Sequence, residues 1–172
     1  MKQNLIKECF VSELKAWNRV HRITGSNDID LLYSESLEGL KSIPQNILGF
    51  IDVGAGSGIM GFPALVERLG ARVCFVEPDI KKASFLLQLK TKVRAIDSSI
   101  ADNMIIMIKD IQSVSRETID QFFSGCPYVL ISRAFSGSTT LKDAVAKSPM
   151  QNIDVFFFHA TQTNKFVLEK LQ

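Results

Sequence analysis

The sequence predicts an α/β protein with a doubly wound, mostly parallel sheet, on the strength of three observations. From residue 46 onward, short apolar segments alternate with longer segments of helical periodicity, which is the order that βαβ units require. The apolar segments are almost continuous, as is typical of strands covered by helices on both faces of a sheet. With 172 residues, 46% of them hydrophobic, the chain is long enough to bury the core of one such domain.

Two helices are expected before the sheet. Apolar residues recur at three- and four-residue spacings over 2–22 and again over 28–42, which predicts a helix in each segment. We expect residues 1–45 to form a helical appendage to the sheet, which occupies 46–172 of a single domain. The expected strands span 48–53, 72–77, 104–109, 128–132 and 153–158, and the expected helices span 61–69, 79–95, 115–124, 138–147 and 162–171. Because the last segment predicts a helix, the sheet is expected to be short at its C-terminal edge.

Composition excludes few function classes. Charged residues make up 22% and the net charge is +2, so charge alone does not indicate a nucleic-acid partner. Cys9, Cys74 and Cys126 cannot all pair and lack the spacing of a metal site, which favours reduced thiols, no metal and a cytoplasmic protein. No apolar run approaches the ~18 residues of a membrane-spanning helix, and the N-terminus does not resemble a signal peptide. We expect no membrane association, and a monomer.

Three alternating glycines follow the first expected strand. Gly54, Gly56 and Gly58 lie between that strand and the next helix, where a turn can present backbone N–H groups to a ligand. Asp52 precedes them, and its carboxylate would repel a pyrophosphate but could accept a hydrogen bond from an ammonium group. The pattern therefore favours S-adenosylmethionine. A nicotinamide dinucleotide, for which Gly56, Gly58 and Gly61 fit G-x-G-x-x-G, and a turn without a ligand are the alternatives.

An acidic residue ends the second expected strand. The carboxylate of Glu77 at this place can accept hydrogen bonds from both ribose hydroxyls of a nucleoside. An exposed acid without a ligand is the alternative. Pro78 then turns the chain, and Asp79 is expected to cap the following helix.

Several stretches together resemble the RsmG (GidB) family, bacterial methyltransferases of small-subunit ribosomal RNA. That family has a W-N-x-x-x-N-L-T-like segment before the sheet, a D-V-G-x-G-x-G-x-P-G-x-P loop and an S-R-A-F turn after the fourth strand. The matching stretches here are residues 14–25, 50–58, 61–63 and 131–135. The chain departs from the family at Leu31-Leu32, in place of an Arg-His pair, and at Met60, in place of the loop proline.

The resemblance implies a class I methyltransferase (Rossmann-like) fold, S-adenosylmethionine as cofactor, and N7 of a guanine in 16S rRNA of the small ribosomal subunit as acceptor. It places Arg133 at the junction of cofactor and substrate, as the catalytic candidate. Together with the pattern above, the candidate cofactor-binding residues are Asp52, Gly54, Gly56, Gly58, Ile59, Glu77, Ile111, Gln112 and Arg133. Of these, Ile111 and Gln112 match a pair that contacts adenine in the family.

Methylation of N7 needs no general base, because this nitrogen has a free lone pair and no proton. The protein need only hold it in line with the methyl group, at about 3–3.5 Å. Phe62 or Phe135 could stack on the guanine, with core packing as the alternative. The candidate phosphate-binding cations are Lys15, Arg19, Arg22, Lys81, Lys82, Lys90, Lys92 and Arg94, and residues 81–94 are favoured because they begin beside the cofactor strand. A methyltransferase of a small molecule or a protein, and a non-catalytic RNA-binding relative, remain alternatives.

Overall fold

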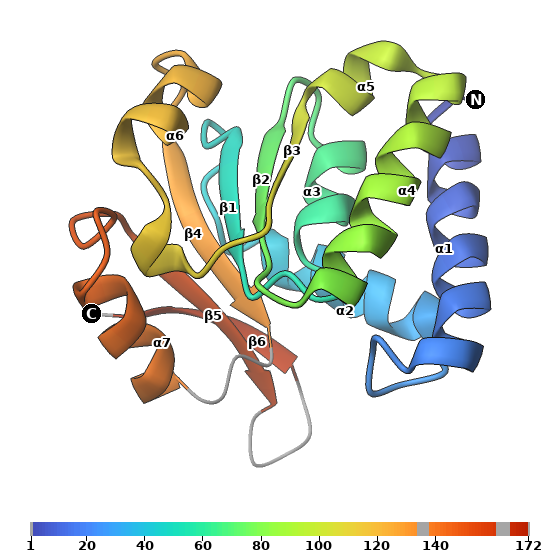
Figure 1. Ribbon diagram of the computed structural model, residues 1–172, viewed down its shortest axis with the longest axis horizontal. Helices are drawn as coiled ribbons and strands as arrows, with labels where there is room; N and C mark the ends of the chain where they lie inside the picture. Colours follow the sequence, from blue (N-terminus) through green and yellow to red (C-terminus); the bar gives the residue numbers. More distant parts are fainter. Residues whose placement is uncertain (1, 134–137, 161–165, 172) are drawn as a thin grey trace.

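A computed structural model of the protein describes residues 2–133, 138–160 and 166–171, and it contains one six-stranded sheet in the order β3-β2-β1-β4-β5-β6 (Figure 1). The first five strands pair in parallel, and β6 is antiparallel to β5. Along the chain the elements are α1 (Lys2–His21), α2 (Ile29–Leu40), β1 (Gly49–Val53), α3 (Gly61–Glu67), β2 (Arg72–Val76), α4 (Ile80–Ile96), α5 (Ser98–Asp102), β3 (Met104–Met107), the 3-10 helix η1 (Ile111–Ser113), α6 (Arg116–Phe123), β4 (Tyr128–Arg133), α7 (Ser138–Ala146), β5 (Val155–Ala160) and β6 (Phe166–Leu171). The doubly wound α/β prediction is confirmed.

The last element corrects the sequence analysis. We expected a helix over 162–171 and no further strand, but Phe166–Leu171 forms β6, which pairs along its length with β5. Without β6, one edge of β5 would leave its backbone N–H and C=O groups without sheet partners, and pairing satisfies them. The weak helical periodicity of this segment is outweighed by that edge. The short helix α5 was also not expected from the sequence.

The two faces of the sheet carry separate cores, because successive strand residues point to opposite sides. Phe50, Phe75 and Ile131 pack in one core with side chains of α1 to α4. Ile51 and Leu130 pack in the other with side chains of α6 and α7. Figure 1 shows the two groups of helices on opposite sides of the strands. Both sheet faces are therefore covered, as the apolar strands indicated.

The N-terminal helices belong to the first of these cores. Phe10 of α1 is fully buried and stacks on Phe62 of α3, with ring centroids 4.4 Å apart. Trp17 packs against Phe85 of α4, at 5.6 Å between centroids. Phe62 is thus a core residue, the alternative that we had weighed against stacking on a base. Phe135 lies outside the described residues.

The described part of the chain lacks two features, a membrane-spanning helix and a cluster of metal ligands. No helix in it has the length and apolar character that crossing a membrane requires. In the same residues, no group of three or more His, Cys, Asp or Glu side chains is placed to hold a metal ion.

Candidate cofactor and substrate site

The candidate site lies where the strand order of the sheet reverses. β1 is flanked by β2 on one side and β4 on the other, and in such sheets ligands bind beyond the carboxyl ends of the strands at this point. Two cavities lie there, and both are lined by Gly54 and Lys82. We name them the Glu77 cavity, of about 430 Å³, and the Arg133 cavity, of about 350 Å³, after a residue that lines each.

The glycine turn between β1 and α3 borders both cavities. Gly54, Gly56 and Gly58 have φ values of 64°, 56° and 73°, in the left-handed region that side chains disfavour. The N–H of Gly54 donates to the carbonyl of Val76 at 2.9 Å, which ties the turn to the end of β2. The alternating glycines are therefore required by the backbone path of the turn, which confirms that they mark a strand-to-helix turn.

Glu77 connects the glycine turn to the start of α4. One carboxylate oxygen accepts a hydrogen bond from the N–H of Gly56 at 2.7 Å, and the other accepts one from the N–H of Asp79 at 2.8 Å. The side chain is 4% exposed, so the alternative of an exposed strand-end acid is wrong. Each oxygen keeps a second lone pair directed elsewhere. A contact with ribose hydroxyls is compatible with this arrangement and stays a prediction.

The residues after β3 reach the same cavity. Ile111 and Gln112 of η1 line the Glu77 cavity together with Val53 and Val76. Ile111 is buried, and its side chain packs in the core on the α6 side of the sheet. The Glu77 cavity thus combines an apolar wall with the amide of Gln112 and with four charged side chains, those of Glu77, Lys82, Lys109 and Asp110. Four candidate residues, Gly54, Glu77, Ile111 and Gln112, are brought together there.

Asp52 lies outside both cavities. Its carboxylate, 1% exposed, accepts a hydrogen bond from the N–H of Gly61 at 2.8 Å, at the start of α3. Strand alternation explains this placement, because Asp52 points to the same face as Phe50, where α3 packs. In the structure Asp52 therefore supports the start of α3, and its contact with the ammonium group of a ligand stays a prediction.

The pKa of Asp52 is raised to about 8, mainly by burial; the hydrogen bond from Gly61 opposes the shift, and the nearby charge of Glu77 adds to it. Between pH 4 and pH 8 the unfolded chain has lost this proton and the folded protein retains it, so stability falls as the pH rises through this window. Asp52→Asn removes the titration but keeps an oxygen for Gly61. We expect the variant to match the parent near pH 4 and to exceed its stability by about 1–3 kcal/mol at pH 8.

Urea unfolding of both proteins across this pH range measures the difference. A constant difference in the free energy of unfolding between pH 4 and pH 8 would show that Asp52 does not titrate there. An Asp79→Asn variant is the control, since Asp79 is exposed and caps α4 through the N–H of Lys82 at 3.0 Å.

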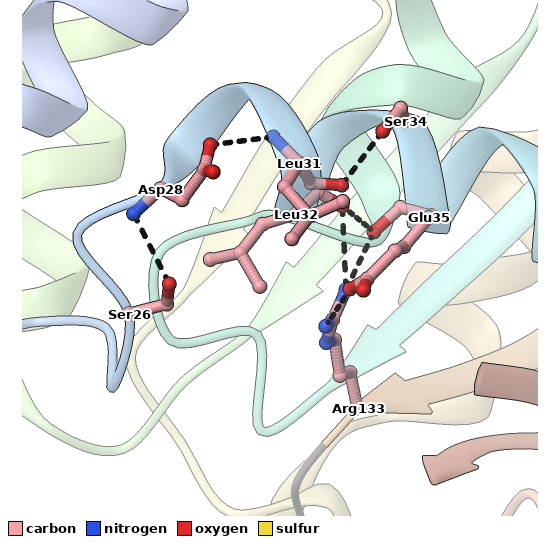
Figure 2. Close-up of polar contacts among 8 residues, drawn as sticks. Ser26, Asp28, Leu31, Leu32, Ser34, Glu35 and Arg133 are labelled. Atoms are coloured by element: carbon pink, nitrogen blue, oxygen red, sulfur yellow. Dashed lines mark hydrogen bonds and ion pairs between the residues drawn. The ribbon is translucent and has the colours of Figure 1, made fainter. Parts of the chain in front are cut away.

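Arg133 joins the end of β4 to α2, as Figure 2 shows. Its guanidinium donates to Glu35 at 2.7 Å, to the hydroxyl of Ser36 at 3.1 Å and to the carbonyl of Leu32 at 3.3 Å. Burial lowers the pKa of Arg133, and the carboxylate of Glu35 opposes that shift. Arg133 also lines the Arg133 cavity with Ile59, Gly56 and Ser57. Its contacts are those of a positioning residue, and a direct contact with substrate or cofactor stays a prediction.

Sequence reasoning missed the role of Asn18, which had only contributed to the family resemblance. The side chain is 6% exposed and organises the loop of residues 22–27. Its amide oxygen accepts from the N–H of Thr24 at 2.9 Å, and its amide nitrogen donates to the carbonyl of Ser26 at 3.1 Å and the side chain of Asn27 at 3.3 Å. Thr24 and Ser26 line the Arg133 cavity, so Asn18 holds one wall of it. A buried polar residue on an otherwise apolar helix face is the signal that could have found it.

Ser132 is a second residue that was not singled out. Its hydroxyl is fully buried and donates to the carbonyl of Val53 at 2.7 Å, across the point where β1 and β4 separate. It therefore satisfies a β1 carbonyl at the floor of the site. A small hydroxyl residue ending an apolar strand is a common pattern, and it carries no specific signal by itself.

Comparison with known proteins agrees with the fold and with the resemblance. The GidB family model, described as rRNA small subunit methyltransferase G, matches residues 3–170. Two relatives share that name: one from Aliarcobacter butzleri, 24% identical over 88% of this chain and 72% of its own length, and one from Campylobacter hominis, 36% identical over 51% of this chain and 48% of its own length. The chain thus spans only about half to three quarters of the length of these relatives.

Among solved structures, magnesium protoporphyrin IX methyltransferase from Synechocystis aligns with all of this chain and 80% of its own, with a TM-score of 0.53 and 13% identity. At this identity the likeness concerns the fold, and it supports the expected class I methyltransferase (Rossmann-like) architecture. The match to the family model covers nearly the whole chain. The chain belongs to the GidB family, described as rRNA small subunit methyltransferase G.

Proposed function

We propose that this chain is an S-adenosylmethionine-dependent methyltransferase that modifies N7 of a guanine in 16S rRNA of the small ribosomal subunit, in the cytoplasm and as a monomer. The observation that carries the proposal is the hydrogen bond that the carboxylate of Glu77 accepts from the N–H of Gly56 in the glycine turn, at 2.7 Å. This hydrogen bond lies where the strand order of the sheet reverses. Membership of the GidB family supports methyl transfer to rRNA of the small subunit.

The residues of the Glu77 cavity fit the nucleoside part of S-adenosylmethionine. A buried carboxylate suits a ribose, and an apolar wall with one amide suits an adenine ring. We assign Glu77 to the ribose, and Ile111 and Gln112 to the adenine. The bare backbone of Gly56, where an added Cβ would meet only the Gly54 carbonyl oxygen at 3.8 Å, leaves room for the sulfonium part at the boundary of the two cavities.

The bound cofactor supplies an activated methyl group, and the chain positions the guanine relative to it. The Arg133 cavity adjoins the glycine turn, and Ile59 and the loop of residues 22–27 form its walls. These walls would hold the guanine in line with the methyl group and exclude water from it. No proton needs to leave N7, so no side chain has to act as a base. Arg133 contributes by holding α2 against the end of β4.

The test is methyl transfer from labelled S-adenosylmethionine to small ribosomal particles, followed by mapping of 7-methylguanosine in the 16S rRNA. Label at one guanine is the expected result. Label in a protein or a small molecule, with none in the RNA, would instead identify the alternative class of methyltransferase. Calorimetric binding of NAD without binding of S-adenosylmethionine would contradict the cofactor assignment.

Glu77→Gln should weaken cofactor binding strongly. The amide must turn its NH₂ group toward one of the two backbone donors, Gly56 or Asp79, so one buried hydrogen bond is lost and the turn loses its anchor. Loss of a charge-assisted hydrogen bond corresponds to about a 10- to 100-fold rise in the Kd for S-adenosylmethionine. Isothermal titration calorimetry measures it.

The matched control is Asp79→Asn, the same acid-to-amide change two residues further along the chain. Asparagine caps a helix about as well as aspartate, so the control should shift the Kd by less than about threefold. Equal effects of the two variants would mean that Glu77 acts only through general charge.

A further inference from the structure

The loop of residues 22–27 separates the Arg133 cavity from a basic groove on its other side. This groove, of about 730 Å³, is lined by Arg19 and Arg22, by Asn18 and Asn27, and by Lys15 among others. None of the described residues that line it is acidic. We call it the Arg19–Arg22 groove. Its positive charges and polar side chains suit a ligand that carries a row of negatively charged groups.

Arg19 and Arg22 of the groove are less occupied than Lys90, Lys92 and Arg94 of α4, whereas Lys81 and Lys82 at the start of α4 also have no ion pair within the described residues. Three of the α4 cations have partners within the protein: Lys90 donates to the carbonyl of Met104 at 2.6 Å, Lys92 pairs with Glu13 at 2.5 Å, and Arg94 pairs with Asp102 at 2.7 Å. Arg19 and Arg22 are exposed, and the described part of the chain holds no acid in ion-pair contact with either. Lys15 pairs with Asp30 at 2.6 Å, but both side chains are at least half exposed.

The groove and the cavity share one wall. Asn18 lines the groove and bonds to Thr24 and Ser26, which line the cavity, and to Asn27, which lines the groove. A strand whose phosphates lie in the groove would therefore be one loop away from the cavity. Enzymes that modify bases bind the target base in a pocket and its backbone outside, and guanidinium groups suit phosphate oxygens.

We propose that the Arg19–Arg22 groove binds phosphates of the RNA strand whose target base enters the Arg133 cavity. The proposal rests on the proposed function for its choice of ligand. It moves the main RNA contact from residues 81–94, which the sequence favoured, to the end of α1 and the loop that follows. Arg19 and Arg22 are the phosphate-binding residues, and Asn18 positions the loop between groove and cavity.

The test compares two double variants that each remove two positive charges. Arg19→Gln with Arg22→Gln changes the groove, and Lys92→Gln with Arg94→Gln changes the paired cations of α4. The probe is a fluorescently labelled 16S rRNA transcript, titrated over a range of salt concentrations. We expect the groove variant to bind at least about tenfold more weakly, and its slope of log K against log salt to be shallower by about 1.4 to 1.8, for two phosphate contacts. The control should stay within about threefold of the parent.

Three outcomes would overturn the proposal: unchanged RNA binding by the groove variant, a larger loss in the α4 variant, or equal competition by polyglutamate for the groove. Cofactor affinity should stay at the parent value, and Arg19→Gln alone, which leaves the 22–27 loop untouched, should show about half of the slope change. If the parent binds the transcript through the groove but transfers no methyl group, the proposed function fails and the groove assignment stands.

Discussion

Gly58→Ala should destabilise the protein by about 2–4 kcal/mol, whereas Gly56→Ala should cost only about 1 kcal/mol. Both glycines have positive φ, so both substitutions carry similar backbone strain. They differ in packing: a Cβ on Gly58 would lie 2.8 Å from Leu86 and 3.2 Å from Phe75, and one on Gly56 would meet only a carbonyl oxygen at 3.8 Å. Strain at Gly58 is therefore compounded by overpacking against a fully buried core.

Urea unfolding without cofactor measures both free energies, and the difference between the two variants isolates the packing contribution. Equal losses at Gly56 and Gly58 would show that Leu86 and Phe75 move aside at no cost. In the presence of cofactor the order can change, because the Gly56 position faces both the turn and the proposed ligand. Unfolding with cofactor present includes the free energy of cofactor binding, so it is measured separately from unfolding without cofactor.

Arg133→Ala should cost about 2–4 kcal/mol of stability, because it leaves the carboxylate of Glu35 in a largely buried place without its partner. The two side chains are 11% and 19% exposed. Removing both, in Arg133→Ala with Glu35→Ala, should cost less than the sum of the single variants, with a coupling of about 1–3 kcal/mol. The matched control is Arg116→Ala on α6, whose pair with Asp120 is exposed and should contribute less than about 1 kcal/mol.

Arg133→Ala, compared with a further variant, Glu35→Gln, separates a positioning role of Arg133 from a direct one. If Arg133 acts through α2, Glu35→Gln should lower both stability and methyl transfer in the same direction as Arg133→Ala. If Arg133 instead only touches the substrate, Arg133→Ala would abolish transfer and leave the urea midpoint unchanged. Thermal and urea unfolding, with single-turnover methyl transfer, distinguish the two.

The sequence predicted the parts of the site that depend on neighbouring residues. The alternating glycines Gly54, Gly56 and Gly58 have the positive φ values that their spacing implied, and Glu77 lies at the strand end where an acid was expected. The apolar strands indicated a sheet covered on both faces, which the two separate cores confirm. Such features are readable because turn geometry and strand burial are local properties of the chain.

What the sequence could not show depends on contacts between distant segments. Arg133 and Glu35 are 98 positions apart, and their pairing follows only from the packing of α2 against the end of β4. Asp52 was assigned to a ligand because it lies near the end of a strand. Whether its side chain faces a cavity or the protein interior depends on which face of the sheet α3 covers. The segment Phe166–Leu171 became a strand because β5 offered it an edge, which no local pattern records.

The shared wall at Asn18 has a thermodynamic consequence. One amide group holds both sides of the 22–27 loop, so a displacement on one side stretches hydrogen bonds that fix the other. Coupling free energies between two ligands are reciprocal. If phosphate binding in the groove raises the affinity of the Arg133 cavity for the base by some factor, binding of the base raises the affinity of the groove for the phosphates by the same factor. Methylation leaves a positive charge on the guanine ring. If this charge lowers the affinity of the Arg133 cavity for the base, the same coupling lowers the affinity of the groove for the phosphates and favours release of the RNA strand.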